Sequence, residues 1–254
     1  MGRQIGRRSS VKFAMERIET FLEKIKNKKL LAVFPHPDDE SVMAGGLIQR
    51  AMKLGFEVTV LTITEGNMGK IHINGKGRSV SEIRREEMAL AMSRLGVADW
   101  IMWKFDDGKL RKTKRWRERL ENFLRQNKYG VIVSYDLSGV SGHPDHIDLS
   151  REIIGYVRKN KPVELIWPSF LGKMREKVAD KRTERYLSKP EFLLEMNFWE
   201  SVKKWRAAFA HRSQSLQGFM GWSWWILSFV EKRECFARFD RNKKYKFRFV
   251  KFKI

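Results

Sequence analysis

The sequence is poor in cysteine, poor in acidic residues and without a long apolar run. Its single cysteine, Cys235, excludes an intrachain disulfide and a cysteine-rich metal site, and it favours a reducing compartment. The longest apolar stretch near the C-terminus, residues 222–230, is too short to cross a bilayer. The basic segment at residues 1–10 is followed by a charged helical pattern, not by the apolar segment of a signal peptide. We therefore expect a cytoplasmic protein with no membrane span.

The shortage of acid leaves a large positive charge. Lys and Arg number 52 against 30 Asp and Glu, which gives a formal net charge of +22. Such a charge attracts anionic partners such as nucleic acid, acidic lipid head groups or phosphorylated small molecules. The basic residues are spread over most segments of the sequence, so a basic, solvated surface is the simpler interpretation. With 42% hydrophobic residues, the chain can still bury a core.

Short apolar runs alternate with amphipathic segments along residues 28–169. Strands are predicted at 30–34, 58–64, 100–103, 131–135 and 165–167, and helices at 45–54, 81–95, 114–126 and from Pro144 onward. Ser81 is expected to cap the helix at 81–95, and Gly96 to end it. This alternation predicts an α/β fold, a Rossmann-like, mostly parallel sheet with helices on both faces.

The two ends of the chain follow other patterns. Residues 1–27 contain an amphipathic pattern that predicts a helix before the core. Residues 170–254 are basic and then aromatic, with a long helix expected from Pro190 to about Ala210. We expect this last segment to form a helical and aromatic cap that completes the same domain.

The hexapeptide Pro-His-Pro-Asp-Asp-Glu at residues 35–40 directly follows the predicted strand at 30–34. In an open α/β sheet, ligands bind just beyond the carboxyl ends of the strands. One imidazole and three carboxylates gathered there are unfavourable unless a cation neutralises them. The adjacent Asp38 and Asp39 point in different directions, so one can bind a metal while the other faces a substrate.

A second cluster, His-Pro-Asp-His at residues 143–146, follows another predicted strand. His146 falls in the first turn of a helix, where the positive helix end favours the neutral imidazole that a metal requires. His143 lies just before the helix, and Asp145 could orient one of the rings. Either cluster alone occurs often by chance. Together they supply the nitrogen and oxygen ligands of a catalytic zinc site.

With these motifs, the chain resembles the N-acetylglucosaminyl-phosphatidylinositol de-N-acetylases and their PIG-L/LmbE-like relatives. Residues 35–40 match the family's first signature, and Gly-His-Pro-Asp-His at 142–146 matches its second. Further similarities occur in family order over roughly residues 28–216. They are Thr64-Glu65-Gly66 with Gly69, the Arg-Arg-Glu-Glu at 84–87, the Asp-Asp-Gly turn within 105–110, and His-Arg-Ser-Gln at 211–214.

The resemblance implies a zinc-dependent N-deacetylase that acts on an N-acetylglucosamine-containing substrate. It assigns one zinc ion per chain to His36, Asp39 and His146, although such sites also accept other divalent ions. The resemblance further implies that Asp38 is a general base. It implies that His143 is a protonated histidine that stabilises an oxyanion, with Asp145 as its carboxylate partner. The substrate contacts that it implies are Arg84, Arg85 and His211.

Two alternatives stay open at this stage. A peripheral membrane deacetylase would use the positive charge and the C-terminal tryptophans, among them Trp199, Trp205, Trp222, Trp224 and Trp225, to reach a lipid-linked sugar. The same aromatic residues could instead pack the cap or cover an interface in a homo-oligomer. A non-catalytic nucleic-acid-binding protein is disfavoured, because a binder has no need for Asp38 or His143. The attached group of the sugar is left open.

Overall fold

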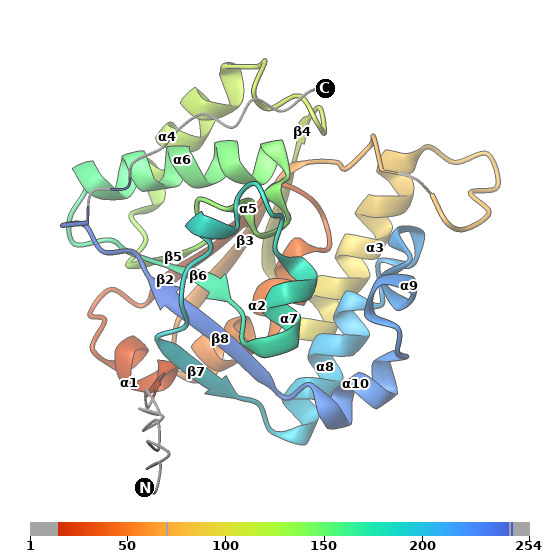
Figure 1. Cartoon of the computed structure of the whole chain (residues 1–254). Coiled ribbons are helices and arrows are strands. Elements are labelled where there is room, and N and C mark those ends of the chain that lie inside the picture. Colours follow the sequence, from red (N-terminus) through yellow and green to blue (C-terminus); the bar gives the residue numbers. More distant parts are fainter. Residues whose placement is uncertain (1–14, 70, 244, 246–254) are drawn as a thin grey trace, which may run out of the picture.

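The computed structural model describes residues 15–69, 71–243 and 245, and these are organised around one sheet of eight strands (Figure 1). The strand order is β1-β7-β8-β6-β5-β2-β3-β4. The strands are β1 Glu16–Arg17, β2 Lys29–Phe34, β3 Glu57–Thr64, β4 Asp99–Phe105, β5 Val131–Val133, β6 Glu164–Ser169, β7 Phe192–Glu195 and β8 Arg233–Arg238.

The central strands β6, β5, β2, β3 and β4 run parallel, and β8 pairs antiparallel with β6 and β7. In β2 every residue from Leu30 to Phe34 is fully buried, as expected for a parallel strand covered on both faces. The predicted α/β fold with a mostly parallel sheet is confirmed.

Helices cover both faces of the sheet (Figure 1). The helices are α1 Ile18–Glu23, α2 Asp39–Lys53, α3 Val80–Leu95, α4 Arg115–Asn127, α5 Gly139–Gly142, α6 Pro144–Lys159, α7 Gly172–Val178, α8 Phe198–Ala208, α9 Leu216–Met220 and α10 Trp224–Val230. Leu30 and Ala32 of β2 pack toward α2, α3 and α8, whereas Leu31 and Val33 pack toward α4 and α6. This alternation follows from the two-residue repeat of a strand.

Two helices begin elsewhere than expected. The capping residue of α3 is Ser79, two residues before the expected Ser81. It forms a capping box with Glu82, and the helix ends at Gly96 in a left-handed conformation. Helix α2 begins at Asp39, ahead of the expected start at 45, so the acidic residues of the first motif form its first turn.

The C-terminal segment contributes strands as well as helices, and the expected continuous helix from Pro190 to about Ala210 is wrong. Residues 192–195 form β7, and α8 starts only at Phe198, after a capping box between Asn197 and Glu200. β8 also comes from this segment, so the cap completes the sheet.

In the N-terminal segment, only residues 18–23 of the expected helix within 1–27 are helical among the described residues. Glu16 and Arg17 form β1, which pairs with β7, and residues 1–14 lie outside the described part. None of the described helices is long and apolar enough to span a membrane.

Candidate active site

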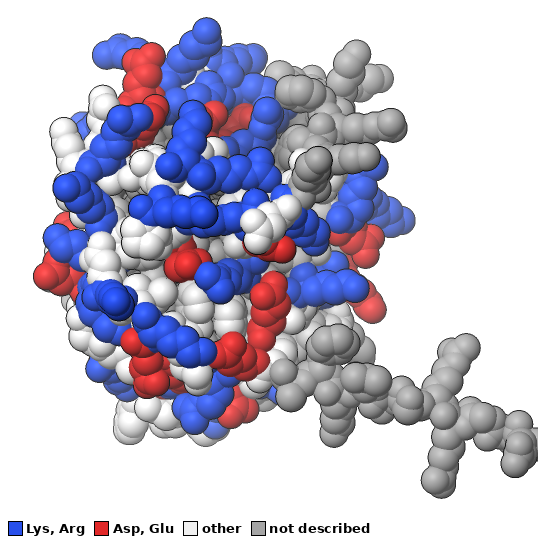
Figure 2. Space-filling view, turned by 90° about the vertical axis from the view of Figure 1, so that its left-hand side faces the viewer, with Lys and Arg blue, Asp and Glu red and all other residues white. Residues whose placement is uncertain are grey.

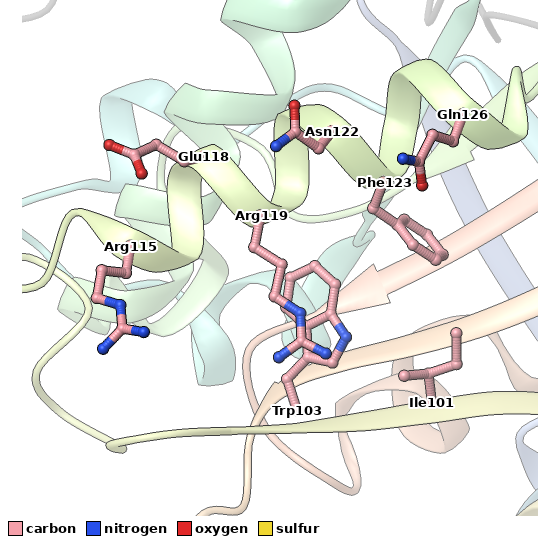
Figure 3. A pocket seen from close by; sticks show the side chains of 8 residues that line it. All are labelled: Ile101, Trp103, Arg115, Glu118, Arg119, Asn122, Phe123 and Gln126. Atoms are coloured by element: carbon pink, nitrogen blue, oxygen red, sulfur yellow. The ribbon is translucent and has the colours of Figure 1, made fainter.

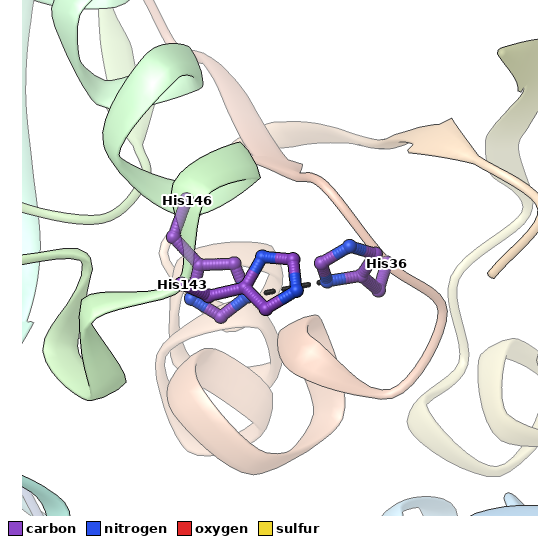
Figure 4. A group of neighbouring side chains, drawn as sticks. All are labelled: His36, His143 and His146. Atoms are coloured by element: carbon purple, nitrogen blue, oxygen red, sulfur yellow. Dashed lines mark hydrogen bonds between the residues drawn. The ribbon is translucent and has the colours of Figure 1, made fainter. Parts of the chain in front are cut away.

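Two connections at the carboxyl edge of the sheet bring distant histidines together. His36 lies between β2 and α2, and His146 lies in the first turn of α6. Figure 4 shows the rings of His36, His143 and His146 gathered from these two places. His36 Nδ1 lies 3.2 Å from His146 Nε2, although 110 positions separate the residues in the chain.

Three potential ligand atoms form a small triangle at this point. Oδ2 of Asp39 lies 3.5 Å from His36 Nδ1 and 3.7 Å from His146 Nε2, and the third side is the 3.2 Å between the two nitrogens. Ligands held tetrahedrally by zinc at about 2.0–2.1 Å are about 3.3–3.4 Å apart. The structure therefore brings His36, Asp39 and His146 together at the spacing that one such ion requires.

Two of these residues are held from behind by contacts to their outer atoms, and the inner oxygen of Asp39 also accepts the backbone N–H of His36 at 3.1 Å. His146 Nδ1 lies 3.0 Å from the carbonyl oxygen of Gly139, which puts the proton on Nδ1 and leaves a lone pair on Nε2. The Tyr135 hydroxyl donates to Asp39 Oδ1 at 2.5 Å, and the Tyr135 ring stacks on His146 with 4.1 Å between centroids. Outer contacts of this kind orient the side chains of metal sites.

His36 has carboxylates behind it. Its Nε2 lies 2.9 Å from Asp107 Oδ1 and 3.5 Å from Asp145 Oδ2. These are ion-pair contacts whose angles fall short of a hydrogen bond, so the buried Nε2 has no aligned partner. Carboxylates behind a histidine are a common outer contact in metal sites.

The inner atoms of this cluster require a positive charge between them. Burial lowers the pKa of His146 to about 4, so that ring is neutral. Burial favours the neutral form of Asp39, but His146 and His36 outweigh it and lower the pKa of Asp39. Burial also opposes a charge on His36, yet Asp107, Asp145 and Asp39 raise its pKa well above the ordinary value. A proton on His36 supplies the charge that a cation bound to deprotonated ligands would supply.

Two other sets of three side chains also place ligand atoms within 4.8 Å of one another among the described residues. They are His36, His143 and His146, and His36, Asp107 and Asp145. We favour the triangle that contains Asp39, because its longest side is 3.7 Å and hydrogen bonds to the outer atoms hold two of its side chains, His146 and Asp39. The donor set of two imidazoles and one carboxylate suits zinc and other divalent ions.

Asp38 stands beside this triangle with an unusual backbone conformation. Its φ is 112°, a value that non-glycine residues rarely adopt. The Glu40 carboxylate accepts the Asp38 backbone N–H at 3.1 Å, and the Arg84 guanidinium donates to the Asp38 carboxylate at 3.2 Å. Burial raises the pKa of Asp38 to about 6, against the opposing effect of Arg84. The pKa of Asp38 is raised and that of Asp39 is lowered, so these neighbouring carboxylates suit different roles. The raised pKa of Asp38 suits it to proton transfer near neutrality.

His143 and Asp145 meet through the backbone. His143 precedes α6, and its Nδ1 accepts the backbone N–H of Asp145 at 3.2 Å. The buried Asp145 carboxylate instead accepts backbone N–H groups of Gly108 at 2.7 Å and Leu110 at 3.2 Å, and faces His36. The implied side-chain pairing of Asp145 with His143 is therefore not formed. Burial and the nearby His36 lower the pKa of His143, so its ring is neutral and carries its proton on Nε2.

Arg84 is buried, and its two terminal nitrogens contact Asp38 and the backbone around it. It donates to the carbonyl oxygens of Gly66 at 2.9 Å and Pro37 at 2.8 Å, besides its contact with Asp38. A Cβ on Gly66 would lie 1.8 Å from the Arg84 guanidinium, so only glycine fits there. This close approach explains the glycine at position 66.

The other two expected substrate contacts lie in different surroundings. Arg85 is part-exposed, with a guanidinium nitrogen 3.6 Å from Glu65. His211 is buried behind Glu40, with Nε2 3.4 Å from a Glu40 oxygen but without an aligned hydrogen bond. The structure therefore places Arg85 at the surface and His211 behind the residue that holds the Asp38 backbone.

Sequence reasoning did not single out Tyr135 or Asp107, which both contact the triangle. Tyr135 was predicted only as the last residue of a strand, and its hydroxyl reaches Asp39 because the chain bends away after β5. Asp107 lies in the Asp-Asp-Gly turn that the resemblance includes. The signal in the sequence was a turn with two adjacent acids, and the structure shows Asp106 exposed and Asp107 buried.

Two sizeable hollows of the described chain lie away from this cluster. A cavity of about 500 Å³ lies between β4 and α4, where Arg119 covers the Trp103 ring at 4.4 Å (Figure 3). Another, of about 850 Å³, lies beside β8 and carries arginines and tyrosines such as Arg185 and Tyr186. Neither contains a residue of the candidate site, so size alone does not mark the functional region.

A Rossmann-like sheet with an imidazole and carboxylate cluster at its carboxyl edge defines the class of this protein. Residues 31–157, half of the chain, match the family described as PIG-L, GlcNAc-PI de-N-acetylase, and the chain belongs to this family. The matched segment runs from β2 to the end of α6 and contains both histidine motifs.

Relatives and a solved structure agree with this assignment. The chain is 32% identical over 120 residues to a diacetylchitobiose deacetylase of Thermococcus kodakarensis, covering 47% of this chain and 45% of the relative. It is 32% identical over 151 residues to a 1D-myo-inositol 2-acetamido-2-deoxy-α-D-glucopyranoside deacetylase of Thermobispora bispora, covering 49% of this chain and 50% of the relative. The chain thus spans about half the length of the curated relatives it matches.

The fold also matches the N,N′-diacetylchitobiose deacetylase of Pyrococcus horikoshii, with a TM-score of 0.66 over 88% of this chain and 92% of that one. At 20% identity this comparison establishes the fold.

Proposed function

We propose that this protein is a metal-dependent amide hydrolase that removes the N-acetyl group from an N-acetylglucosamine-containing substrate. The observation that carries the proposal is the triangle of His36, Asp39 and His146 beside Asp38, a carboxylate outside the triangle. Family membership and the acetamido sugars in the names of the curated relatives support the substrate class.

His36, Asp39 and His146 would hold one divalent cation, and zinc suits their donor set. When bound, such an ion acts as a Lewis acid that polarises a carbonyl and acidifies water. The contacts of Tyr135 and Asp107 would hold two of the ligands in place. The short distances among the three inner atoms support this assignment.

Asp38 would act as the general base and then as the acid. With a pKa of about 6 it is mostly ionised at neutral pH and can accept a proton from the attacking water. The same proton then passes to the departing nitrogen as the carbon–nitrogen bond of the acetamide breaks. A carbon–oxygen bond has formed in its place, so the products are acetate and a free amino sugar.

His143 would stabilise the negative oxygen that develops during attack. Because its Nδ1 is an acceptor, the ring can donate from Nε2 as a neutral imidazole, without the protonated form that the family resemblance implied. Arg84 would position Asp38, and Asp145 would position His36. Arg85, which is part-exposed, is the better candidate for contact with the substrate.

The test is acetate release from a panel of N-acetylglucosamine conjugates, measured on the protein as purified, after chelation and after restoring zinc. We expect turnover that chelation removes and zinc restores. Metal analysis should give about one ion per chain. Full activity in the chelated protein, or acetate release from no conjugate of the panel, would contradict the proposal.

A membrane-peripheral form of the same activity is the second candidate. Trp199, Trp222 and Trp225 are 70%, 55% and 56% exposed, and Arg206 lies over the Trp224 ring at 5.9 Å. Basic side chains also cover much of the face in Figure 2, spread among acidic ones. Retention of the protein on anionic vesicles, if added salt abolishes that retention, would support the membrane-peripheral form. A homo-oligomer would cover the same tryptophans, and a concentration-dependent mass in solution would reveal it.

The free thiol of Cys235 favours the cytoplasm as the place of action. A nucleic-acid-binding role does not account for this site, because DNA binding needs no oriented triangle of metal ligands. Salt-dependent DNA binding by this protein, purified without bound metal, would favour the nucleic-acid-binding role instead.

A further inference from the structure

Asp38 occupies the N-cap position of α2 but does not cap the helix. A capping aspartate usually has an extended backbone, and its carboxylate accepts an N–H group of the first helical turn. Asp38 has a φ of 112° and a ψ of −34°, and its side chain accepts none of the N–H groups in the first turn of α2. The carboxylate contacts Arg84 instead. Other contacts must therefore keep Asp38 in this unfavourable conformation.

The peptide unit that joins Pro37 to Asp38 is held at both of its polar groups. The Arg84 guanidinium donates to the Pro37 carbonyl oxygen at 2.8 Å. The Glu40 carboxylate accepts the Asp38 N–H at 3.1 Å. The next peptide unit is fixed as well, because the Asp38 carbonyl oxygen accepts the Val42 N–H at 3.2 Å. Since φ and ψ of Asp38 relate these two units, holding both units sets the direction of its side chain.

Glu40 is fully buried and has neighbours at its other oxygen. The Ser41 hydroxyl donates to Oε1 at 2.7 Å, and His211 Nε2 lies 3.4 Å from the same atom. His211 is only 1% exposed, and neither of its ring nitrogens has an aligned partner among the described residues. Because an imidazole without a hydrogen bond is costly to bury, its position against Glu40 indicates a role.

Helix α3 anchors this network on two sides. It carries Arg84 and, one turn further on, Glu87. The Glu87 carboxylate accepts the backbone N–H and the hydroxyl of Ser213 at 2.7 Å each. Ser213 lies two residues beyond His211, so the helix that holds the Pro37 carbonyl oxygen also holds the segment that carries His211.

We propose that Glu40 and His211 are positioning residues for the reaction. Glu40 fixes the backbone of Asp38, and His211 keeps the Glu40 carboxylate turned toward that backbone. The inference rests on the proposed deacetylase function, and it gives His211 a role other than the substrate contact that the family resemblance implies. The consequence is that the Asp38 carboxylate stays away from the N–H groups of α2, which would otherwise bind it.

The first test removes the acceptor that holds Asp38, with a conjugate that the unaltered protein turns over. Glu40→Leu should lower kcat by about 10–100-fold with little change in KM, because a misplacement of about 1 Å is enough for such a loss. Glu40→Gln keeps an oxygen for the Asp38 N–H and should recover most of the rate. His211→Leu should fall between the two, since Glu40 then loses only its neighbour. Equal kcat in Glu40→Leu and the unaltered protein would overturn the inference.

Leu227→Ala is the matched control for a loss of stability. Leu227 is also 1% exposed, and it packs with Trp205 of α8 in the same C-terminal part of the chain. This variant should lower the thermal midpoint and leave kcat of the folded protein unchanged. A fall in its kcat equal to that of His211→Leu would show that lost packing alone explains the effect, and would overturn the role of His211.

A double variant separates positioning from a general effect. If His211 acts through Asp38, His211→Leu should change the residual kcat of Asp38→Asn by less than about twofold, because the residue that it positions is already disabled. A loss of the same size in the presence and in the absence of the Asp38 carboxylate would contradict the inference.

Crystal structures and metal analysis give a readout that needs no turnover. In Glu40→Leu we expect Asp38 to leave the φ near 112° and its carboxylate to approach the N–H groups of α2. The metal content should stay at about one ion per chain. His211→Leu provides the same test if Glu40→Leu does not fold. An unmoved Asp38, or loss of the metal, would overturn the positioning role and leave the deacetylase intact. A displaced Asp38, in a protein whose unaltered form releases acetate from no conjugate, would support the network and contradict the proposed function.

Discussion

Two groups of charged residues meet at the two ends of α2, and they differ in how completely their members are paired. Near its C-terminal end, Glu200 meets Arg50 and Lys53 at 2.8 Å each. At its N-terminal end, two imidazole nitrogens face each other at 3.2 Å with a carboxylate oxygen beside them. The Glu200 group is complete from its own residues. The histidine group requires an added proton or cation.

Burial of charge alone therefore does not identify a functional site. The Glu200 group closes the contact between α2 and α8, and each charge has an opposite partner. The histidine group holds one buried nitrogen without an aligned partner, His36 Nε2, and a strained Asp38. An arrangement that is unfavourable on its own, and that its surroundings hold in place, indicates a role in binding or catalysis.

The sharpest way to test this difference is to neutralise Asp38. Asp38→Asn should lower kcat by about 10²–10⁴-fold, because an amide cannot accept the proton of water. Metal content and the thermal midpoint should stay near those of the unaltered protein, since Asp38 lies outside the triangle. Asp106→Asn, at an exposed acid of the neighbouring turn, is the control and should retain activity. Unchanged turnover in Asp38→Asn would remove Asp38 from the mechanism.

A second test decides which side chains complete the triangle. His146→Ala and Asp39→Asn should each release the metal, whereas His143→Ala should retain about one ion per chain and lower kcat. Elemental analysis of the purified variants gives the answer without reference to activity. Loss of metal in His143→Ala, with retention in Asp39→Asn, would replace our ligand set with the three histidines.

A third test concerns the residue behind His36. Asp107→Asn should weaken metal affinity by about 10–100-fold, the usual cost of removing an outer carboxylate. Competition with a chelator of known affinity measures the change. Asp106→Asn again serves as the control, because its side chain points to solvent one position away. Equal affinities in the two variants would show that Asp107 does not orient His36.

The smallest effect on activity is expected from the Glu200 group. Glu200→Gln should lower the free energy of unfolding by about 2 kcal/mol, between the values for exposed and buried pairs, because Lys53 is 56% exposed and Glu200 is buried. Its kcat should not change. Glu121→Gln, in an exposed pair with Arg125, should cost about 0.3–0.5 kcal/mol.

The pH dependence of this stability has a definite sign. Burial favours the neutral acid, but Arg50 and Lys53 outweigh it and lower the pKa of Glu200 to about 2, from an ordinary 4.5. A depressed folded-state pKa adds stability that is present above pH 4.5 and is lost as the pH falls toward 2. The difference in free energy of unfolding between Glu200→Gln and the unaltered protein, measured by urea unfolding, should therefore fall to near zero over that interval. A difference that is constant down to pH 2 would exclude an ionic origin.

The sequence predicted the core of the fold and the two clusters because both depend on local patterns. Continuous apolar runs mark parallel strands, and the motif after each strand lies at the same edge of the sheet. The strand β7 was missed because its four residues, 192–195, lie within a segment of helical composition. Its pairing with β8 and β1 depends on residues far away in the chain.

Side-chain contacts at the site were predicted less well. Whether Asp145 faces His143 or His36 depends on the turn at Gly108 and Leu110, more than thirty residues away. Likewise, the charge of Arg84 suggested contact with a substrate, but its burial commits it to Gly66 and Pro37. Residue type and spacing do not contain this information.

The pairing of β1 with β7 has a consequence for how the chain acquires its shape during synthesis. Glu16 is among the first described residues to leave the ribosome, but its neighbour in the sheet, Phe192, emerges only after all of the segment that carries the histidines. The N-terminal strand must wait while the central part of the sheet assembles, and its joining is a late step. Because contacts between residues so far apart in the chain are slow to form, a pause in translation before β7 would leave this edge open to pairing with other chains.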